Sequence, residues 1–230
     1  MRRYAGRHIC AFKNAVKTLK KRYDEFHRTP TKFKDMQPEY PHPRYYQSSD
    51  GKTCFRYIRS LQANKLLFVA ETDAGERLCV KFTRTYDRTV HEQCAAWGIA
   101  PRLRGFHDDV PGGWKMVVMD FLEEYECLYD VKRDLSHGQQ EKLGDELKTM
   151  LEALHQMSFV HGDVRDANVM VKTDRSGWRL VDFDWSGKIG EVRYPMNVNR
   201  GTGLKRPEGV LDGNLILAEH DMEMMSYLFR

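Results

Sequence analysis

The sequence predicts an α+β protein in two parts: a small antiparallel sheet crossed by one helix, and then a mostly helical part. Between residues 53 and 122, short β-prone runs alternate with turn residues, which is typical of antiparallel strands. After residue 136, leucines and methionines recur at helical spacing. A polar stretch at residues 161–168 interrupts the apolar runs. Because polar loops held between buried segments commonly carry function, we expect a site there.

The composition is that of an ordinary globular protein. Of 230 residues, 41% are hydrophobic and 30% are charged, which excludes a disordered chain. The sequence has no apolar run of roughly 18 residues and no apolar segment near its start, so we expect neither a membrane span nor a secretory signal. The five cysteines are scattered without C-x-x-C spacing, which favours a reducing compartment over disulfides or a zinc site. We therefore expect an intracellular protein of the cytoplasm or nucleus.

The first 36 residues are strongly basic. They hold eleven Lys or Arg against three acidic residues, a net +8, whereas the remainder sums to −4. Apolar residues spaced by three and four predict an amphipathic helix over residues 5–27, followed by a proline-containing connector up to residue 51. The basic face suits an anionic partner such as nucleic acid, a membrane surface or an import receptor. The plainer interpretation is a solvated basic face, with the apolar stripe docked on the body.

Residues 52–122 are predicted to form the sheet part. A helix should begin after Asp87, a suitable N-cap, and end at Gly98. Turn residues separate five β-prone runs, two of which follow this helix. The predicted strands are Thr53–Leu61, Leu66–Thr72, Arg77–Thr83, Arg102–Phe106 and Trp114–Leu122.

Residues 123–230 are predicted to form the helical part. Ser136 and Gln139 have the spacing of a capping box, and a buried stripe runs from Leu143 to Leu154. Two short strands, Asn168–Lys172 and Trp178–Asp182, should follow the polar loop, and then an extended segment up to about residue 214. A last helix is expected to begin near Asp221.

The polar loop reads His161-Gly162-Asp163-Val164-Arg165-Asp166-Ala167-Asn168, and Asp182-Phe183-Asp184 follows it. Magnesium-dependent phosphoryl transfer needs one carboxylate to orient a hydroxyl, and an amide and a second carboxylate to hold the metal. The two segments contain that set.

The order of these segments resembles the protein-kinase-like superfamily over residues 53–230. The loop resembles H-R-D-x-x-x-x-N, Asp182-Phe183-Asp184 resembles D-F-G, and Leu78-Cys79-Val80-Lys81 resembles the V-A-I-K strand. Val181–Gly187 and Arg206–Gly209 also resemble kinase-like proteins of fungi. The resemblance implies a two-lobed fold with a small antiparallel N-lobe and a short, mostly helical C-lobe. It also implies a kinase that uses ATP and Mg²⁺.

The resemblance assigns roles to individual residues. Lys81 would grip the α- and β-phosphates and pair with Glu92 on the helix. Asp163 would orient the acceptor hydroxyl, and Arg165 would stabilise the transferring phosphoryl group. The metal ligands would be Asn168 and Asp182. Three further residues would support the structure: His161 beneath the loop, Glu208 at the end of the activation segment and Asp221 below the loop. The residues expected to contact the adenine, including the hinge, are Leu67, Cys79, Met119, Asp120, Leu122, Met170 and Val181.

The sequence departs from this family at three places. The turn Gln62-Ala63-Asn64-Lys65 stands where a glycine-rich loop would cover the phosphates, so Lys65 is a candidate for the missing positive charge. Gly162 replaces the arginine that reads a phosphorylated activation loop, and Asp184 replaces the glycine of D-F-G. The last two departures resemble small-molecule kinases of the aminoglycoside and choline type.

Three interpretations stay open. The first is an ATP- and Mg²⁺-dependent phosphotransferase that acts on serine or threonine hydroxyls of proteins. The second is a kinase for a small metabolite, favoured by Gly162 and Asp184. The third is an inactive pseudokinase, a binding module that contacts its partner through the basic helix.

Overall fold

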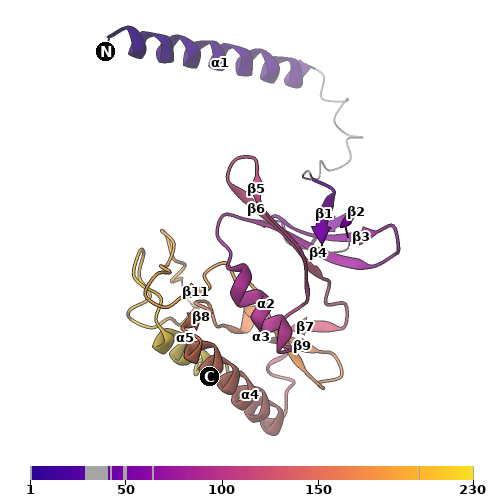
Figure 1. Ribbon diagram of the computed structural model, residues 1–230. Coiled ribbons are helices and arrows are strands. Elements are labelled where there is room, and N and C mark those ends of the chain that lie inside the picture. Colours follow the sequence, from indigo (N-terminus) through magenta and orange to yellow (C-terminus); the bar gives the residue numbers. More distant parts are fainter. Residues whose placement is uncertain are drawn as a thin grey trace. The chain divides into compact units, whose positions relative to one another are not determined.

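The computed structural model describes residues 2–28, 41, 43–48, 51–63, 65–201 and 203–229 (Figure 1). The chain divides into two compact units, Met1–His42 and Pro43–Arg230, which we describe separately. Within the larger unit, we call residues 43–122 the N-lobe and residues 123–229 the C-lobe. In the described part of the chain, no helix is long and apolar enough to cross a membrane.

The smaller unit contains one helix, α1 (Arg2–Arg28), which confirms the helix predicted over residues 5–27. Taken by itself, the helix has an apolar stripe whose described side chains are exposed: Ile9, Phe12, Val16, Leu19 and Tyr23. Most of the predicted connector, residues 29–40, 42, 49 and 50, lies outside the described residues. The docking of α1 on the body stays a prediction.

The N-lobe is built on one six-stranded antiparallel sheet in the order β1-β2-β3-β4-β6-β5. Its strands are β1 (Tyr45–Ser48), β2 (Gly51–Ser60), β3 (Leu67–Thr72), β4 (Arg77–Thr83), β5 (Leu103–Val110) and β6 (Trp114–Asp120). The five predicted strands are confirmed, with β5 longer and β6 shorter than expected. Strand β1 was missed, because four residues beside prolines within the expected connector carry too short a pattern to predict a strand.

The sheet curls so that β1 also contacts β5. Gly105 on β5 permits this approach, since a Cβ there would lie 2.6 Å from the Cβ of Tyr46. One face of the sheet carries an aromatic row in which consecutive rings lie 5.3–6.3 Å apart: Phe55, Tyr57, Phe68 and Phe82. Because side chains alternate along a strand, Lys81 on β4 points to the other face. The aromatic core therefore leaves the Lys81 face available for a site.

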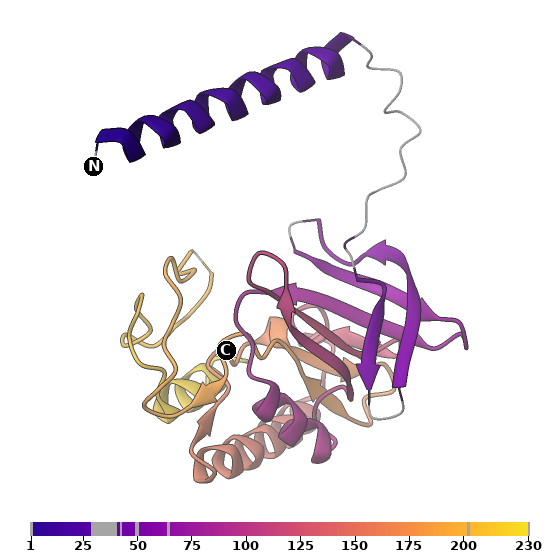
Figure 2. The same cartoon turned by 45° about the horizontal axis from the view of Figure 1, so that its top comes forward.

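Helix α2 (Arg88–Ala96) lies between the sheet and α4 (His137–Gln156) (Figures 1 and 2). The predicted N-cap is confirmed, since the Asp87 carboxylate accepts a 2.8 Å hydrogen bond from the Val90 amide. Gly98, at φ +73°, follows the last turn, as expected for a residue that ends a helix. Val90, His91 and Cys94 are buried.

The C-lobe contains two main helices, α4 (His137–Gln156) and α5 (Ala218–Met225), and the short α3 (Leu128–Val131). The Ser136–Gln139 capping box and the buried stripe of α4 are confirmed. Short strands form two small sheets, one of β7 (Tyr125–Cys127), β9 (Val169–Lys172) and β10 (Trp178–Leu180), and the other of β8 (Phe159–Val160) and β11 (Gly187–Lys188). One apolar core joins α2, α3, α4, β9, β10 and α5.

Helix α5 begins at Ala218, earlier than the predicted start near Asp221. Asp221 lies in the first turn, and its carboxylate accepts hydrogen bonds from another segment instead of capping its own helix. The His220 ring accepts the Leu217 amide at the helix start.

Candidate active site

The loop 161–168 is fixed from below by α5. The buried Asp221 carboxylate accepts 2.8 Å hydrogen bonds from the backbone amides of His161 and Gly162, and His155 Nε2 lies 3.2 Å away. Hydrogen bonds from backbone amides to a carboxylate are among the stronger ones in proteins. The structure therefore brings Asp221 to the position that the sequence suggested for it.

Gly162 is glycine for two physical reasons. Its φ of +85° lies in the left-handed region, where a side chain is strained. A Cβ would also lie 2.7 Å from the Trp185 carbonyl oxygen and 3.1 Å from Ile216. The arginine that this position carries in the resembling family therefore does not fit here.

His161 is fully buried beneath the loop. Its Nε2 lies 3.2 Å from the Val181 carbonyl oxygen, and its Nδ1 lies 3.3 Å from the Asp163 amide nitrogen. These partners fit a neutral ring with the proton on Nε2. Burial lowers the pKa of His161, against the raising effect of Asp221, so the ring stays neutral.

Three side-chain nitrogens converge on the Asp163 carboxylate. Asn168 Nδ2 donates to Oδ2 at 2.8 Å, and Arg165 Nε donates to the same oxygen at 3.1 Å. Arg206 Nη2 donates to Oδ1 at 2.9 Å. Asn168 Nδ2 also donates to the Asp163 carbonyl at 2.9 Å. The carboxylate is thus held in one orientation by two of the predicted site residues and by Arg206, to which the resemblance assigned no role in the site.

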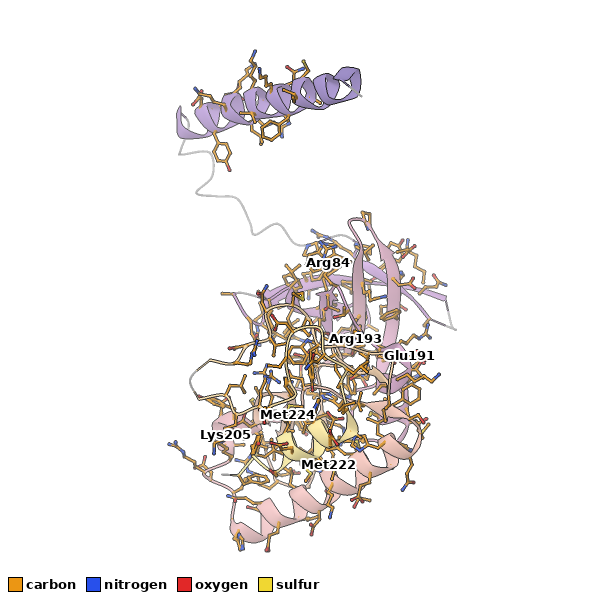
Figure 3. The ribbon with its side chains drawn as sticks, turned by 90° about the vertical axis from the view of Figure 1, so that its left-hand side faces the viewer. Arg84, Glu191, Arg193, Lys205, Met222 and Met224 are labelled. Atoms are coloured by element: carbon orange, nitrogen blue, oxygen red, sulfur yellow. The ribbon has the colours of Figure 1, made fainter. Side chains whose placement is uncertain are left out.

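Arg206 reaches the site from the expected end of the activation segment, two residues before Glu208. Its side chain is 4% exposed, and its guanidinium lies 4.8 Å from the centre of the Trp185 ring. It also donates to the Asn199 carbonyl at 2.9 Å, and its Nη1 lies 3.6 Å from the sulfur of Met224. Figure 3 labels Met224 on α5. A cation before a proline occurs in many surface loops, so the sequence held no specific signal for it.

Glu208 was expected to support this segment, but the structure places it on the surface. Among the described residues, it takes part in none of the hydrogen bonds or ion pairs that fix the site. Arg206, two residues earlier, makes the buried contacts instead.

Lys81 contacts two carboxylates. Its Nζ lies 2.5 Å from Asp182 Oδ1 and 2.6 Å from Asp184 Oδ1, and Thr83 donates to Asp184 Oδ2 at 3.0 Å. The predicted Lys81–Glu92 ion pair is wrong in this structure. Glu92 lies on the solvent side of α2 and pairs with Arg88 at 2.8 Å. The family resemblance suggested Glu92, whereas Asp184, a departure from the family, takes the contact.

The two carboxylates on Lys81 differ in their electrostatics. Burial raises the pKa of Asp182, but the positive charges of Lys81 and Lys65 lower it by more. The pKa of Asp182 therefore lies well below its usual range. Burial and the neighbouring Asp182 raise the pKa of Asp184 to about 6, against the lowering effect of Lys81. Asp182 therefore stays charged to a lower pH than Asp184, and both carboxylates are mostly ionised at neutral pH.

Phe183 fixes the triplet that holds these carboxylates. Its ring stacks on His91 of α2, with centroids 4.7 Å apart, and lies edge-on to His161 at 5.2 Å. Its carbonyl accepts a 3.1 Å hydrogen bond from the amide of Asp87, the cap of α2. The triplet is thus tied to both lobes.

The predicted adenine-contacting residues fall into two groups. Leu67 lies opposite Lys81 and Cys79 opposite Met119 in the sheet register, which places all three apolar residues on the Lys81 face. The others lie on different segments. Asp120 ends β6 and pairs with Arg104 at 2.5 Å, while Leu122 follows that strand and Met170 and Val181 lie in the C-lobe, all three half-buried.

A cavity of about 190 Å³ joins the polar groups. It is lined by Lys65, Asp163, Arg165, Asp182, Asp184 and Trp185. The oxygen donors near it, the Asp182 and Asp184 carboxylates and the Asn168 amide, are the hard ligands that Mg²⁺ prefers. The described residues contain no group of three His, Cys, Asp or Glu able to hold a metal, so an amide would have to complete such a set. The donor chemistry fits Mg²⁺.

These features define a protein-kinase-like fold: a curled antiparallel N-lobe with one helix, a helical C-lobe, and a polar loop between them. The chain is similar in structure to the Cydia pomonella granulovirus kinase PK-1, with a TM-score of 0.60 and 18% sequence identity. The likeness covers 74% of this chain and 65% of the viral kinase, so the chain spans just under two thirds of that protein's length. No protein-family profile and no curated protein sequence matches the chain. At this identity, the likeness shows the fold.

Proposed function

We propose that the protein is an ATP- and Mg²⁺-dependent phosphotransferase that transfers the γ-phosphate to a hydroxyl group. The observation that carries this proposal is the single cavity in which Asp163, Asp182 and Asp184 meet, with Lys81 bound to the last two. A carboxylate for the acceptor, a lysine for the phosphates and oxygen donors for a metal are the parts that phosphoryl transfer requires.

Asp163 would orient the acceptor. Its Oδ2 already accepts two hydrogen bonds, whereas Oδ1 accepts one, from Arg206, and keeps a lone pair for a hydroxyl. In the transfer, the hydroxyl oxygen bonds to the γ-phosphorus as the bond to the β-phosphate oxygen breaks, ADP leaves, and the proton passes to Asp163. Because the transition state is loose, positioning by Asp163 matters more than its basicity.

Lys81, Asn168 and Asp182 would bind the phosphate donor and its metal ion. The buried Lys81 ammonium supplies a fixed positive charge for the α- and β-phosphates. Asn168 and Asp182 would hold Mg²⁺, which neutralises phosphate charge when bound. The Arg165 guanidinium, on the cavity wall, lies where it can stabilise the transferring group.

We propose serine or threonine in a protein as the acceptor. A small hydroxyl-bearing metabolite is the second candidate, and a specific observation favours it. The backbone at Gly162 has no room for the arginine through which regulated protein kinases read their loop, and Asp184 contacts Lys81 directly.

The test begins with thermal stabilisation by millimolar ATP, with and without Mg²⁺, because a ligand that binds only the native state raises the melting temperature. Turnover is then compared for the wild type and Asp163→Asn, with a mixed protein substrate and with aminoglycoside and choline acceptors. We expect a Mg²⁺-dependent shift, and turnover that Asp163→Asn abolishes. A shift without turnover would support the binding-module interpretation. No shift and no turnover would refute the proposal, and turnover by Asp163→Asn would refute the assigned role.

A further inference from the structure

The turn between β2 and β3 brings a second lysine to the site. Lys65 Nζ lies 3.5 Å from Asp182 Oδ2, on the other oxygen from the one that Lys81 contacts. Its side chain is 48% exposed and lines the same cavity as Asp163 and Asp184. A residue of an N-lobe turn thus reaches the carboxylate proposed to bind the metal.

The sheet register fixes where this lysine starts. Leu67, two residues later, lies opposite Lys81, and the Leu66 carbonyl accepts the Phe82 amide at 2.8 Å. The turn is closed on its other side by the Leu61 amide, which donates to the Leu67 carbonyl at 2.8 Å. Lys65, in the turn just before β3, and Lys81 on β4 therefore start close together, and both ammonium groups reach Asp182.

The four charges balance. Lys65 and Lys81 carry two positive charges, and Asp182 and Asp184 supply two carboxylates within 2.5–3.5 Å of them. If Asp182 held a metal ion, the two lysines would lose part of their counter-charge and would favour the oxygens of a phosphate chain. Lys65 can exchange its ion pair with Asp182 for one with a phosphate oxygen. Its side chain is flexible and half-exposed, so solvent screens the ion pair with Asp182 and makes it weak.

We propose that Lys65 binds the terminal phosphates of the nucleotide, replacing by one side-chain charge the backbone amides that a glycine-rich turn supplies. The inference rests on the proposed function and deepens it. Lys81 lies deeper in the N-lobe sheet and serves the inner phosphates, while Lys65 approaches from the turn on the Asp182 side. Lys65 therefore makes the site selective for nucleoside triphosphates over monophosphates.

Nucleotide affinity in the presence of Mg²⁺ tests this selectivity without relying on turnover. Dissociation constants for ATP, ADP and AMP are measured calorimetrically on the full chain for the wild type, Lys65→Met and Lys65→Arg. Arg56→Met is the matched control, because Arg56 is an exposed cation of the same hairpin that pairs with Glu71. We expect Lys65→Met to weaken ATP binding about tenfold, the loss of one charge-assisted contact, and to leave AMP binding within about twofold. Lys65→Arg should retain most of the affinity, and the Arg56 variant all of it.

Three results would overturn the inference. ATP binding by Lys65→Met as tight as that of the wild type would remove Lys65 from the phosphate site while the proposed function stands. Equal losses for ATP and AMP would indicate a change in pocket shape rather than a lost phosphate contact. If the wild type binds no nucleotide, both the inference and the proposed function are refuted. Lys65→Gln, which keeps a polar side chain, replaces Lys65→Met if that variant does not fold.

Discussion

Arg206 is expected to be the strongest single contributor to the stability of the segment beside the site. Arg206→Met removes a 2.9 Å ion pair whose side chains are 4% and 9% exposed, the bond to Asn199 and the contact with the Trp185 ring. Removing one partner of a buried pair costs about 3–5 kcal/mol when the other charge is left alone. Asp163 keeps Arg165 and Asn168 as donors, so we expect a loss of about 2–3 kcal/mol in the free energy of unfolding.

Urea unfolding followed by circular dichroism measures this loss. The control is Arg200→Met, because Arg200 pairs with Asp212 at 3.4 Å but is 48% exposed, and an exposed pair contributes about 0–1 kcal/mol. A double-mutant cycle of Arg206→Met with Asp163→Asn isolates the pair itself. If Arg206→Met costs no more than the Arg200 variant, the buried ion pair does not hold the segment, and the reasoning is wrong.

Two further predictions concern the loop and the helix that carry the site. Gly162→Ala should destabilise the protein by about 2–4 kcal/mol in urea, from a positive φ and a Cβ contact of 2.7 Å, whereas Gly144→Ala, in α4 with open space around it, should be neutral or stabilising by up to about 1 kcal/mol. Equal effects of these two variants would contradict the steric account of the loop. Burial lowers the pKa of His91 to about 4, against the opposing bond to Pro101, so the unfolded chain takes up the proton first as the pH falls. Its contribution is complete above pH 6.5 and is lost by about pH 4, a change of about 3 kcal/mol. Unfolding of the wild type and His91→Gln at several pH values measures this, and a pH-independent difference between them would exclude it.

Sequence patterns predicted those elements that carry a strong local signal. The Asp87 cap and the Ser136–Gln139 capping box each depend on neighbouring residues only, and the structure has them as expected. Strand β1 lacks such a signal, because it has only four residues and Tyr46 packs on Gly105, which is distant in sequence.

The candidate site was predictable by residue type but not by partner. Asp163, Asn168 and Asp182 stand out because polar residues interrupt apolar runs, and the structure brings the first two into direct contact. Which acid faces Lys81 depends on the rotation of α2, and no single-sequence pattern fixes that rotation to within one residue. Glu92 was therefore assigned by analogy, and Asp184 was not. Arg206 reaches Asp163 across 43 residues of sequence, so only the folded chain reveals it.

The stacked Phe183 has a consequence for the design of ligands for this site. A compound that enters behind the proposed nucleotide site must expel this ring from between His91 and His161, and must also break its backbone hydrogen bond to the cap of α2. Such a compound would spend part of its binding free energy on rearranging the protein. Chemical probes for this protein are better directed at the cavity beside Asp163. There, Lys65 and Arg165 are positively charged side chains that are partly exposed to solvent.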